Sequence, residues 1–201
     1  MTSILKVDTI QDADGNNIIN ESGNTITIGA SGDTISIPSG ATFNINGTAG
    51  TGIGTNTPAF FVELSSSQSG VSDDTFTKVT FNNEEFDTAS AFDSSTNYRF
   101  TVPSGEAGKY VFFAQVDVDS ESNSNLDNST LQFKKNGSVI RSQEYNHLNN
   151  PPRSHVVAST ILEAMSESDY MEIFVRLEAT DAGGGRFNGT NSFFGGYKII
   201  E

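Results

Sequence analysis

Apolar and polar positions alternate over short stretches of the chain, most clearly in the segment GKYVFFA. There Gly108, Tyr110 and Phe112 occupy every second position, and Val111 and Phe113 fill the positions between them. A period of two is typical of a β-strand. Apolar residues at both sets of positions indicate a strand that is covered on both faces.

Similar short patterns recur through the C-terminal three quarters of the chain, separated by turn signals such as Val102-Pro-Ser-Gly105 and Asn136-Gly137. Helical periodicity is almost absent. The sequence therefore predicts an all-β sandwich. Its strands are expected at residues 60–64, 75–81, 111–118, 131–134, 139–140, 154–162 and 171–177.

Residues 1–57 have a different pattern, rich in Gly, Asn, Thr and Ile. An alternating stretch at 4–10 and a turn at 12–16 come first. Three short units follow, and each carries two apolar residues two positions apart: Ile26/Ile28, Ile35/Ile37 and Phe43/Ile45. Each unit reads as a short strand with one apolar face. Three such short strands enclose almost no volume by themselves. We therefore expect three chains to pack the apolar faces of these strands around a common axis as a β-prism. A disordered linker is the alternative.

A Gly-rich joint at 48–58 separates the two patterns. We therefore expect an attachment and stem segment at 1–57 and a globular head at 58–201.

Net charge is −14, from 11 Lys and Arg against 25 Asp and Glu. This charge repels phosphate backbones, so nucleic-acid binding is not expected. No apolar run reaches membrane-spanning length and no secretory signal is visible, so membrane insertion is not expected either. With no Cys, stability must come from packing or assembly.

Catalytic residues are not evident. His147 lies in an Asn/Pro-rich stretch, and Ser154 precedes His155 directly, which places their side chains on opposite faces of a strand. We expect no enzymatic activity and no organic cofactor.

One ion site is conceivable. Asp117 and Asp119 share a strand face and precede Glu121, and such oxygen ligands favour calcium. A solvated acidic face is the alternative interpretation.

Three polar segments, 119–129, 144–153 and 181–191, are expected as loops at the ends of the sandwich, where binding residues commonly lie. Tyr145, Arg153 and Arg186 are the rare aromatic and basic residues in them, and they are our receptor-binding candidates. Any exposed loop has a similar polar composition.

The stretch from Phe81 to Ala114 resembles the signature of the C1q domain. The aromatic, acidic and glycine positions that match are Phe81, Asp87, Phe92, Phe100, Gly108, Tyr110 and Phe112. Phe100 lies one residue late, the following gap is two residues longer than usual, and Ala114 replaces an aromatic. Phe194, Gly196 and Tyr197 resemble the final strand of the family.

This resemblance implies a C1q/TNF-like ten-strand jelly roll. In that family the heads form tight threefold trimers, with aromatics of the signature and the terminal strand in or near the subunit contact. Some members bind calcium near the apex of the head.

The N-terminal segment resembles those of marine, cyanophage-like phage fibre and structural proteins. Together the two resemblances predict a homotrimeric virion protein of a tail or neck fibre type, located on the tail, neck or capsid surface and assembled in the host cytoplasm. Residues 1–57 would contact other virion proteins, and the head would contact a host-surface glycan or protein or another part of the virion. Alternatives are a capsid head fibre or decoration protein, a soluble C1q-like ligand-binding protein, and a polysaccharide-cleaving spike, which would need a carboxylate pair in a groove.

Overall fold

The computed structural model describes residues 9–11, 13–15, 17–22, 25–28, 31–37, 39–41, 56–147 and 149–199. The chain forms two compact units, Met1–Thr51 and Gly52–Glu201. Each unit is described by itself.

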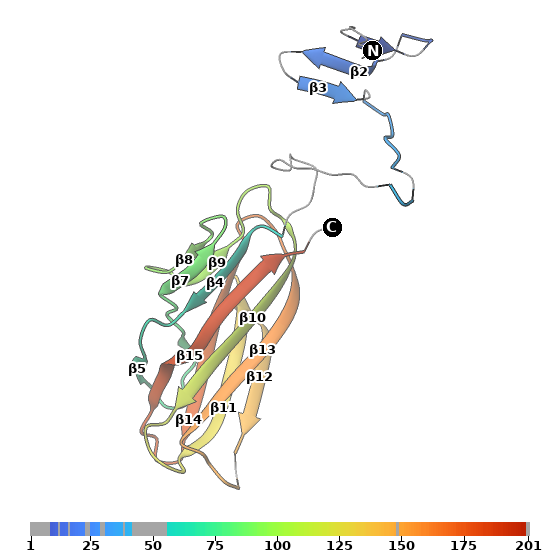
Figure 1. Cartoon of the computed structure of the whole chain (residues 1–201). Coiled ribbons are helices and arrows are strands. Elements are labelled where there is room, and N and C mark those ends of the chain that lie inside the picture. The colour runs from blue at the N-terminus through green and yellow to red at the C-terminus, as the bar shows by residue number, and fades with distance from the viewer. Residues whose placement is uncertain are drawn as a thin grey trace, which may run out of the picture. The chain divides into compact units, whose positions relative to one another are not determined.

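The N-terminal unit contains a three-stranded antiparallel sheet in the order β1-β2-β3 (Figure 1). Its strands are β1 (Thr9–Gln11), β2 (Asn17–Ser22) and β3 (Thr25–Ile28). Ile10 pairs with Ile19, and Ile19 pairs with Ile28, so these three isoleucines form one row across the sheet. All three are exposed in the single chain. The predicted turn is confirmed, and Gly15 adopts a φ of 86° within it.

The strand predicted around Ile35 and Ile37 is wrong for the single chain. Residues 33–37 have no regular secondary structure, and both isoleucines are exposed. An extended segment becomes a strand only when a neighbouring strand accepts its hydrogen bonds. The predictions for residues 4–8, Phe43 and Ile45 lie outside the described residues, and the β-prism stays a prediction.

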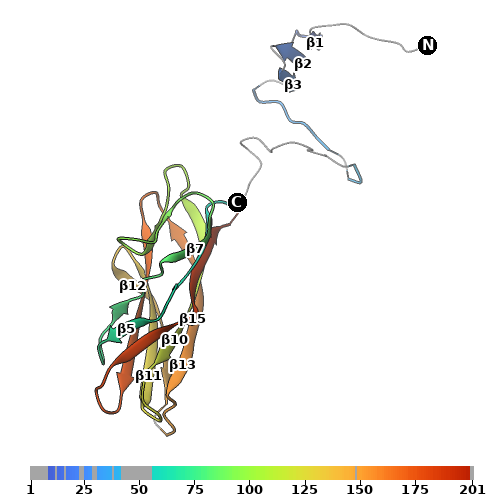
Figure 2. The ribbon, with the colours of Figure 1, turned by 60° about the vertical axis from the view of Figure 1, so that its left-hand side comes forward.

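The second unit is the head, an all-β sandwich of two six-stranded sheets. One sheet has the order β13-β10-β15-β4-β7, with β5 paired to β15. The other has the order β12-β11-β14-β9-β8, with β6 paired to β14. In Figure 1 the first sheet lies in front of β11, β12 and β14, and Figure 2 shows the head turned by 60°.

The strands of the first sheet are β4 (Ala59–Glu63), β5 (Gln68–Val71), β7 (Asn83–Asp87), β10 (Gly108–Asp119), β13 (Ser154–Met165) and β15 (Gly185–Lys198). Those of the second are β6 (Thr77–Lys78), β8 (Phe92–Asp93), β9 (Arg99–Thr101), β11 (Leu126–Lys135), β12 (Ser138–Asn146) and β14 (Tyr170–Ala179). No helix that could cross a membrane occurs in the part of the chain that the structure describes.

The head has two distinct ends. Ala59, which begins β4, pairs with Tyr197 near the end of β15, so the chain enters and leaves the head at the same end. We call the opposite end, where β10 finishes at Asp119 and β13 and β15 begin, the far end.

Three segments expected as loops are partly strands. β11 begins at Leu126, β12 continues to Asn146, and β15 begins at Gly185. Arg186 therefore lies in a strand. Gly, Asn and Ser lower strand propensity locally, but pairing with β10 and β5 holds this segment extended.

The Asn136-Gly137 hairpin is confirmed. Both residues adopt positive φ, 51° and 79°, as a two-residue hairpin turn requires. The Asn136 side chain donates a hydrogen bond to Asp169 (2.7 Å) and accepts one from the backbone N–H of Tyr170 (2.9 Å). The turn is thus fastened to the neighbouring loop.

The aromatic residues of the signature all lie in the core between the sheets. Phe81, Phe92, Phe100, Tyr110 and Phe112 are buried, and Phe100 packs against both Tyr110 and Phe112. Asp87 accepts the backbone N–H of Phe92 (2.7 Å), which holds the approach to β8. The ring at the centre of this core comes from the last strand: Phe194 contacts Phe60, Phe81, Phe92, Phe112 and Phe133.

Tyr110 combines an apolar and a polar role. Its ring is fully buried, and its hydroxyl donates to the backbone oxygen of Glu106 (2.6 Å). Burial, with the charge of Glu106, raises the pKa of Tyr110 to about 12, so the hydroxyl stays a donor at neutral pH.

We expect Tyr110→Ala to lower the free energy of unfolding by about 3–5 kcal/mol, because it removes a buried ring and leaves a cavity. Tyr110→Phe should cost only about 1 kcal/mol, the value of one hydrogen bond. Urea unfolding followed by circular dichroism measures both. Near-neutral stability of the alanine variant would contradict the position of Tyr110 in the core.

Candidate functional site

The outer side of the β13-β10-β15-β4-β7 sheet is unusually aromatic for a surface. We call it the aromatic face, and define it by Phe61, Phe86, Phe113, Leu162, Phe193 and Tyr197. Strand register places these residues on the same side: Phe113 stands opposite Gly195, and Gly195 stands opposite Phe61. Leu162 is 61% exposed and Phe86 is 51% exposed.

The rings at the centre of the aromatic face contact one another. Phe61 lies 5.4 Å from Phe193 and 6.3 Å from Phe113, and Phe113 lies 6.4 Å from Phe193, measured between ring centroids. Phe86 extends the cluster at 6.4 Å from Phe61. The result is a continuous apolar surface on a part of the head that its own chain leaves uncovered.

This surface has a counterpart inside the core. The chain carries Phe-Phe pairs at 60–61, 112–113 and 193–194, on the neighbouring strands β4, β10 and β15. Each pair sends one ring inward and the other outward, because successive side chains of a strand point to opposite faces. The inner rings Phe60, Phe112 and Phe194 also contact one another, at 5.0 to 6.4 Å.

Glycine in β15 makes room for this packing. A Cβ atom added to Gly195 would lie 2.5 Å from the ring of Phe113, so the ring rests directly over the glycine backbone. A Cβ at Gly196 would meet the ring of Phe112 at 2.6 Å on the other side of the sheet. The Gly-Gly step therefore allows both aromatic layers to lie close to the sheet.

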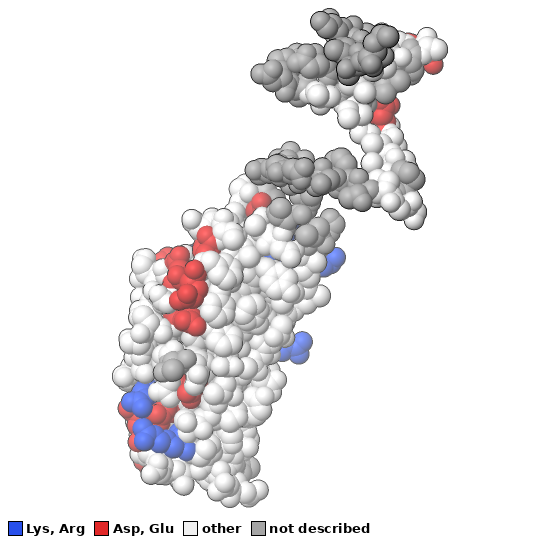
Figure 3. Space-filling model, in the orientation of Figure 1, with Lys and Arg blue, Asp and Glu red and all other residues white. Residues whose placement is uncertain are grey.

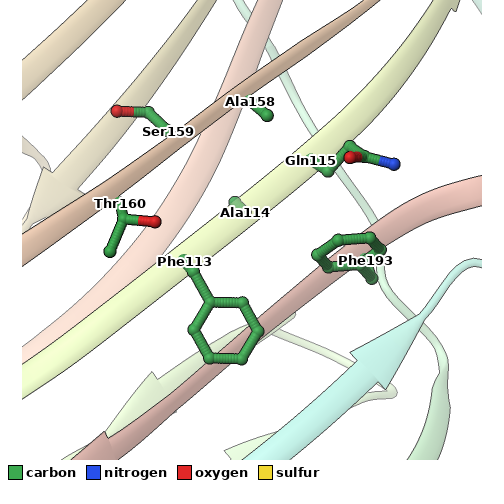
Figure 4. Close-up of a pocket in the computed structure, with 7 residues that line it drawn as sticks. All are labelled: Phe113, Ala114, Gln115, Ala158, Ser159, Thr160 and Phe193. Carbon is green, nitrogen blue, oxygen red and sulfur yellow. The ribbon is translucent and has the colours of Figure 1, made fainter.

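A shallow hollow of about 440 Å³ lies beside these rings, lined by residues of β10, β13 and β15. Figure 4 shows Phe113 and Phe193 side by side, with Gln115 next to Phe193 and with Ala158 and Thr160 on the neighbouring strand β13. The lining has no charged side chain. Such a surface suits an apolar protein segment better than a polar ligand.

Few charged side chains lie on this face. Figure 3 shows the surface over the middle of β10, β13 and β15 almost entirely uncharged, whereas acidic residues gather over β4 and β7 and residues of both signs gather at the lower left of the head. Glu63 and Asp117 lie on the same side of the sheet as the aromatic rings, and Glu63 stands opposite Phe193. An apolar centre with a charged rim is the usual arrangement of a protein–protein interface.

A second apolar surface lies along the neighbouring edge of the sandwich. β12 pairs only with β11 and presents Val139, which is 50% exposed, and Ile140. Val156 of the edge strand β13 is also exposed, but it lies toward the far end and, as the partner of Asp117, on the same side of its sheet as the aromatic face.

The outer side of the second sheet is polar by contrast. Lys134 lies over the ring of Phe174 (3.7 Å from its centroid), Lys78 pairs with Glu172, and Arg176 pairs with Asp74 (2.9 Å). Interspersed charges of both signs suit contact with water. The two outer faces of the head therefore differ sharply.

At the far end, Asp119 is the centre of an ion-pair network. Its carboxylate accepts hydrogen bonds from Nε of Arg153 (3.0 Å), Nη2 of Arg186 (2.9 Å) and the backbone N–H of Glu121 (2.7 Å). Burial raises the pKa of Asp119, but these hydrogen bonds outweigh it and hold the pKa below its ordinary value. The structure thus brings Arg153 and Arg186 together, as partners of one buried carboxylate.

These contacts bear on the calcium candidate. Asp119 is 4% exposed and both its oxygens face guanidinium groups, while Asp117 contacts only the side chain of Asn191 (3.4 Å). Among the described residues no group of three His, Cys, Asp or Glu side chains could hold a metal ion. Calcium binding stays a prediction, and it would require the arginines to leave Asp119.

Tyr145 lies in β12 rather than in a loop, and its ring contacts that of His155 at 4.6 Å between centroids, with the planes tilted by 49°. His147 contacts the other side of this cluster, also 4.6 Å from His155. The three receptor-binding candidates therefore all lie toward the far end, but Arg153 and Arg186 are engaged by Asp119. Their role as receptor contacts stays a prediction.

His155 does have a hydroxyl partner, although Ser154 is not that partner. Its Nδ1 lies 3.2 Å from Oγ of Ser129 in β11. Ser129 is completely buried, so a substrate has no route to its oxygen. This pair acts as a structural hydrogen bond.

No family model and no curated protein matches this chain. Solved structures do match its fold. The globular domain of zebrafish complement 1qA protein is 22% identical, with a TM-score of 0.50, covering 72% of this chain and 99% of that one. Eiger TNF from S. frugiperda is 17% identical, with a TM-score of 0.50, covering 71% of this chain and 92% of that one. The head is a C1q/TNF-like jelly-roll domain, as predicted, although the structure describes twelve strands in it rather than ten.

Sequence reasoning missed the aromatic face. It took the aromatics of the signature as core or subunit contact, and the structure places them in the core. The aromatic face comes from the alternate residues, among them Phe61, Phe113 and Phe193. The three Phe-Phe pairs were the available signal, because a strand with large apolar rings on both faces has two surfaces to cover.

We expect Asp119→Asn to lower the free energy of unfolding by about 2 kcal/mol at pH 7, because hydrogen bonds to a charged group are lost. Since folding depresses the pKa of Asp119, its contribution is present above the unfolded value of about 3.9 and disappears as pH falls below it. Urea unfolding at pH 7 and pH 3 should therefore show a smaller difference between wild type and variant at pH 3. An equal difference at both pH values would contradict the charged network.

Proposed function

We propose that this chain is a homotrimeric structural protein of a phage virion, of a tail or neck fibre type. Its N-terminal segment attaches to the particle, and its C1q/TNF-like head contacts a host surface or another virion component. The proposal depends most on one observation, the uncovered aromatic face.

The aromatic face is the kind of surface that another protein covers. Single exposed apolar residues are ordinary on protein surfaces, but a contiguous cluster of rings marks an interaction site. Burial of such rings is worth roughly 25 cal/mol per Å² of apolar area removed from water. Other copies of the same chain are present wherever the protein is, so a second head can cover this face.

A closed ring of heads is one arrangement that covers the aromatic face. If the β12–β13 edge of one head packs on the aromatic face of the next, each copy uses two different surfaces. Such a heterologous contact generates a ring when its rotation closes. The C1q/TNF-like fold makes three the expected number of copies.

The N-terminal sheet supports the same assembly. Ile10, Ile19 and Ile28 form an apolar row on a small sheet that its own chain leaves exposed. Ile26 is also exposed on β3. Three copies could bury these rows against one another, and a separate N-terminal unit is then free to bind a different partner from the head.

A virion position is supported by the resemblance of residues 1–57 to phage fibre N-termini. The proposed role is mechanical and adhesive, and it needs no catalytic group and no cofactor. Three heads on one stem would also bind a repetitive surface with avidity, provided that the geometry lets them engage together.

We expect the full chain to have the mass of a trimer by light scattering, and Phe113→Asp/Phe193→Asp to reduce it to the monomer. Two buried carboxylates per contact would remain unpaired, and their desolvation would exceed the gain from packing. Phe174→Asp is the control, because it places a new carboxylate on the outer side of the other sheet. It should leave the trimer intact.

A monomeric wild-type chain would contradict the proposed assembly, as would a double variant that keeps the wild-type mass while circular dichroism shows it folded.

We also expect the chain to be part of purified particles produced by cells that carry its gene. Mass spectrometry of density-purified virions should detect it in a copy number divisible by three. Immunogold labelling would then assign it to the tail, neck or capsid. Its absence from washed particles would contradict the virion role without affecting the trimer.

A further inference from the structure

The two histidines of the chain lie in contact at the far end of the head, although they come from different sheets. His147 directly follows β12, an edge strand of the second sheet, and His155 is the second residue of β13, an edge strand of the first. Their ring centroids are 4.6 Å apart, and the ring planes are tilted by 60°. The fold thus brings two imidazoles together across the edge of the sandwich.

The separation of the rings is one that a shared metal ion produces. An imidazole nitrogen binds zinc at about 2.0–2.1 Å. Two imidazoles on one ion, at an angle of about 90–110°, therefore have their ring centroids roughly 4.5–5.2 Å apart. The observed 4.6 Å lies within this range. A direct contact between two rings gives a similar distance, so the surroundings of the nitrogen atoms decide between them.

The nitrogen atoms of both rings suit metal binding. Nε2 of His147 is buried and has no hydrogen-bond partner among the described residues. A buried polar atom without a partner is costly, and a bound ion would satisfy it. Nδ1 of His155 lies 3.2 Å from Oγ of Ser129. With Nδ1–H donating to that oxygen, Nε2 keeps a lone pair for an ion, and metal-binding histidines usually make such a second hydrogen bond.

The remaining coordination positions are open to water. Among the described residues, no third His, Cys, Asp or Glu side chain completes a metal-binding group with these two. A hollow of about 480 Å³ lies beside His147, and its other described lining residues are asparagines, among them Asn146. A hollow with this polar lining admits water. The protein would therefore supply two ligands and the solvent the others.

We propose that His147 and His155 bind a divalent transition-metal ion of the zinc class, which clasps the end of β12 to the start of β13. Imidazole is a ligand for zinc, copper and nickel, whereas calcium and magnesium prefer oxygen. The role is structural, because β12 and β13 each pair with a single neighbouring strand and the ion joins their two sheets. The clasp depends neither on the virion role nor on the trimer.

Calorimetric titration of the full chain, without a histidine tag, with zinc chloride at pH 7.5 tests the clasp, because imidazole is mostly uncharged at that pH. One ion per chain should bind. His147→Phe and His155→Phe keep the aromatic contact but remove a ligand, so each should weaken binding at least about tenfold. Tyr145→Phe is the matched control, since it keeps the third ring of the cluster, and it should bind zinc like the wild type. Millimolar magnesium should not compete.

Proton NMR of the same titration identifies the ligands directly. The imidazole C–H signals of both histidines should shift or broaden as zinc is added, whereas the ring signals of Tyr110 in the core should not. The melting temperature should rise with zinc concentration, because the ion binds the folded chain.

Zinc binding that either histidine variant keeps at wild-type strength would overturn the site, because the ion would then be held elsewhere, such as on surface carboxylates. Competition by magnesium would overturn it for the same reason. If a variant fails to fold by circular dichroism, the wild-type NMR titration decides: imidazole signals that stay unchanged at millimolar zinc would contradict the clasp.

Discussion

The packing of aromatic rings on both sides of β4, β10 and β15 is the constraint on which the head depends. The inner rings Phe60, Phe112 and Phe194 unite the two sheets, and the outer rings Phe61, Phe113 and Phe193 lie directly behind them. Gly195 and Gly196 permit this double layer, because side chains there would collide with Phe113 and Phe112. A sheet built in this way has a strongly apolar second face. The fold and the exposed aromatic face thus follow from the same residues.

Much of the fold could be predicted from the sequence, because it depends on local alternation and turn residues. The period of two around Tyr110 located β10, and Asn136-Gly137 located the β11–β12 hairpin. The sequence predicted that GKYVFFA is covered on both faces, but in the single chain Val111 and Phe113 face outward and are only half-buried. The strand around Ile35 failed for the opposite reason: a pattern shows an apolar stripe but not whether its own chain supplies a partner strand.

The candidate sites were harder to predict, because they depend on contacts between distant residues. Arg153 and Arg186 look like free binding groups in the sequence, yet both hold the buried carboxylate of Asp119. His155 looks isolated beside Ser154, yet the fold joins it to Ser129, Tyr145 and His147. Strand register decides each of these contacts, and a shift of one residue would place the same side chains on the other face.

The central claim is that another copy of the head covers the aromatic face, and one indole can report on it directly. The chain contains no Trp, so Phe193→Trp introduces a single fluorophore at the centre of that face. The emission should be shifted to the blue and protected from acrylamide at micromolar protein concentration. It should become red-shifted and readily quenched when Phe113→Asp is added. Emission of a fully hydrated indole in the otherwise unmodified, folded chain would contradict the account.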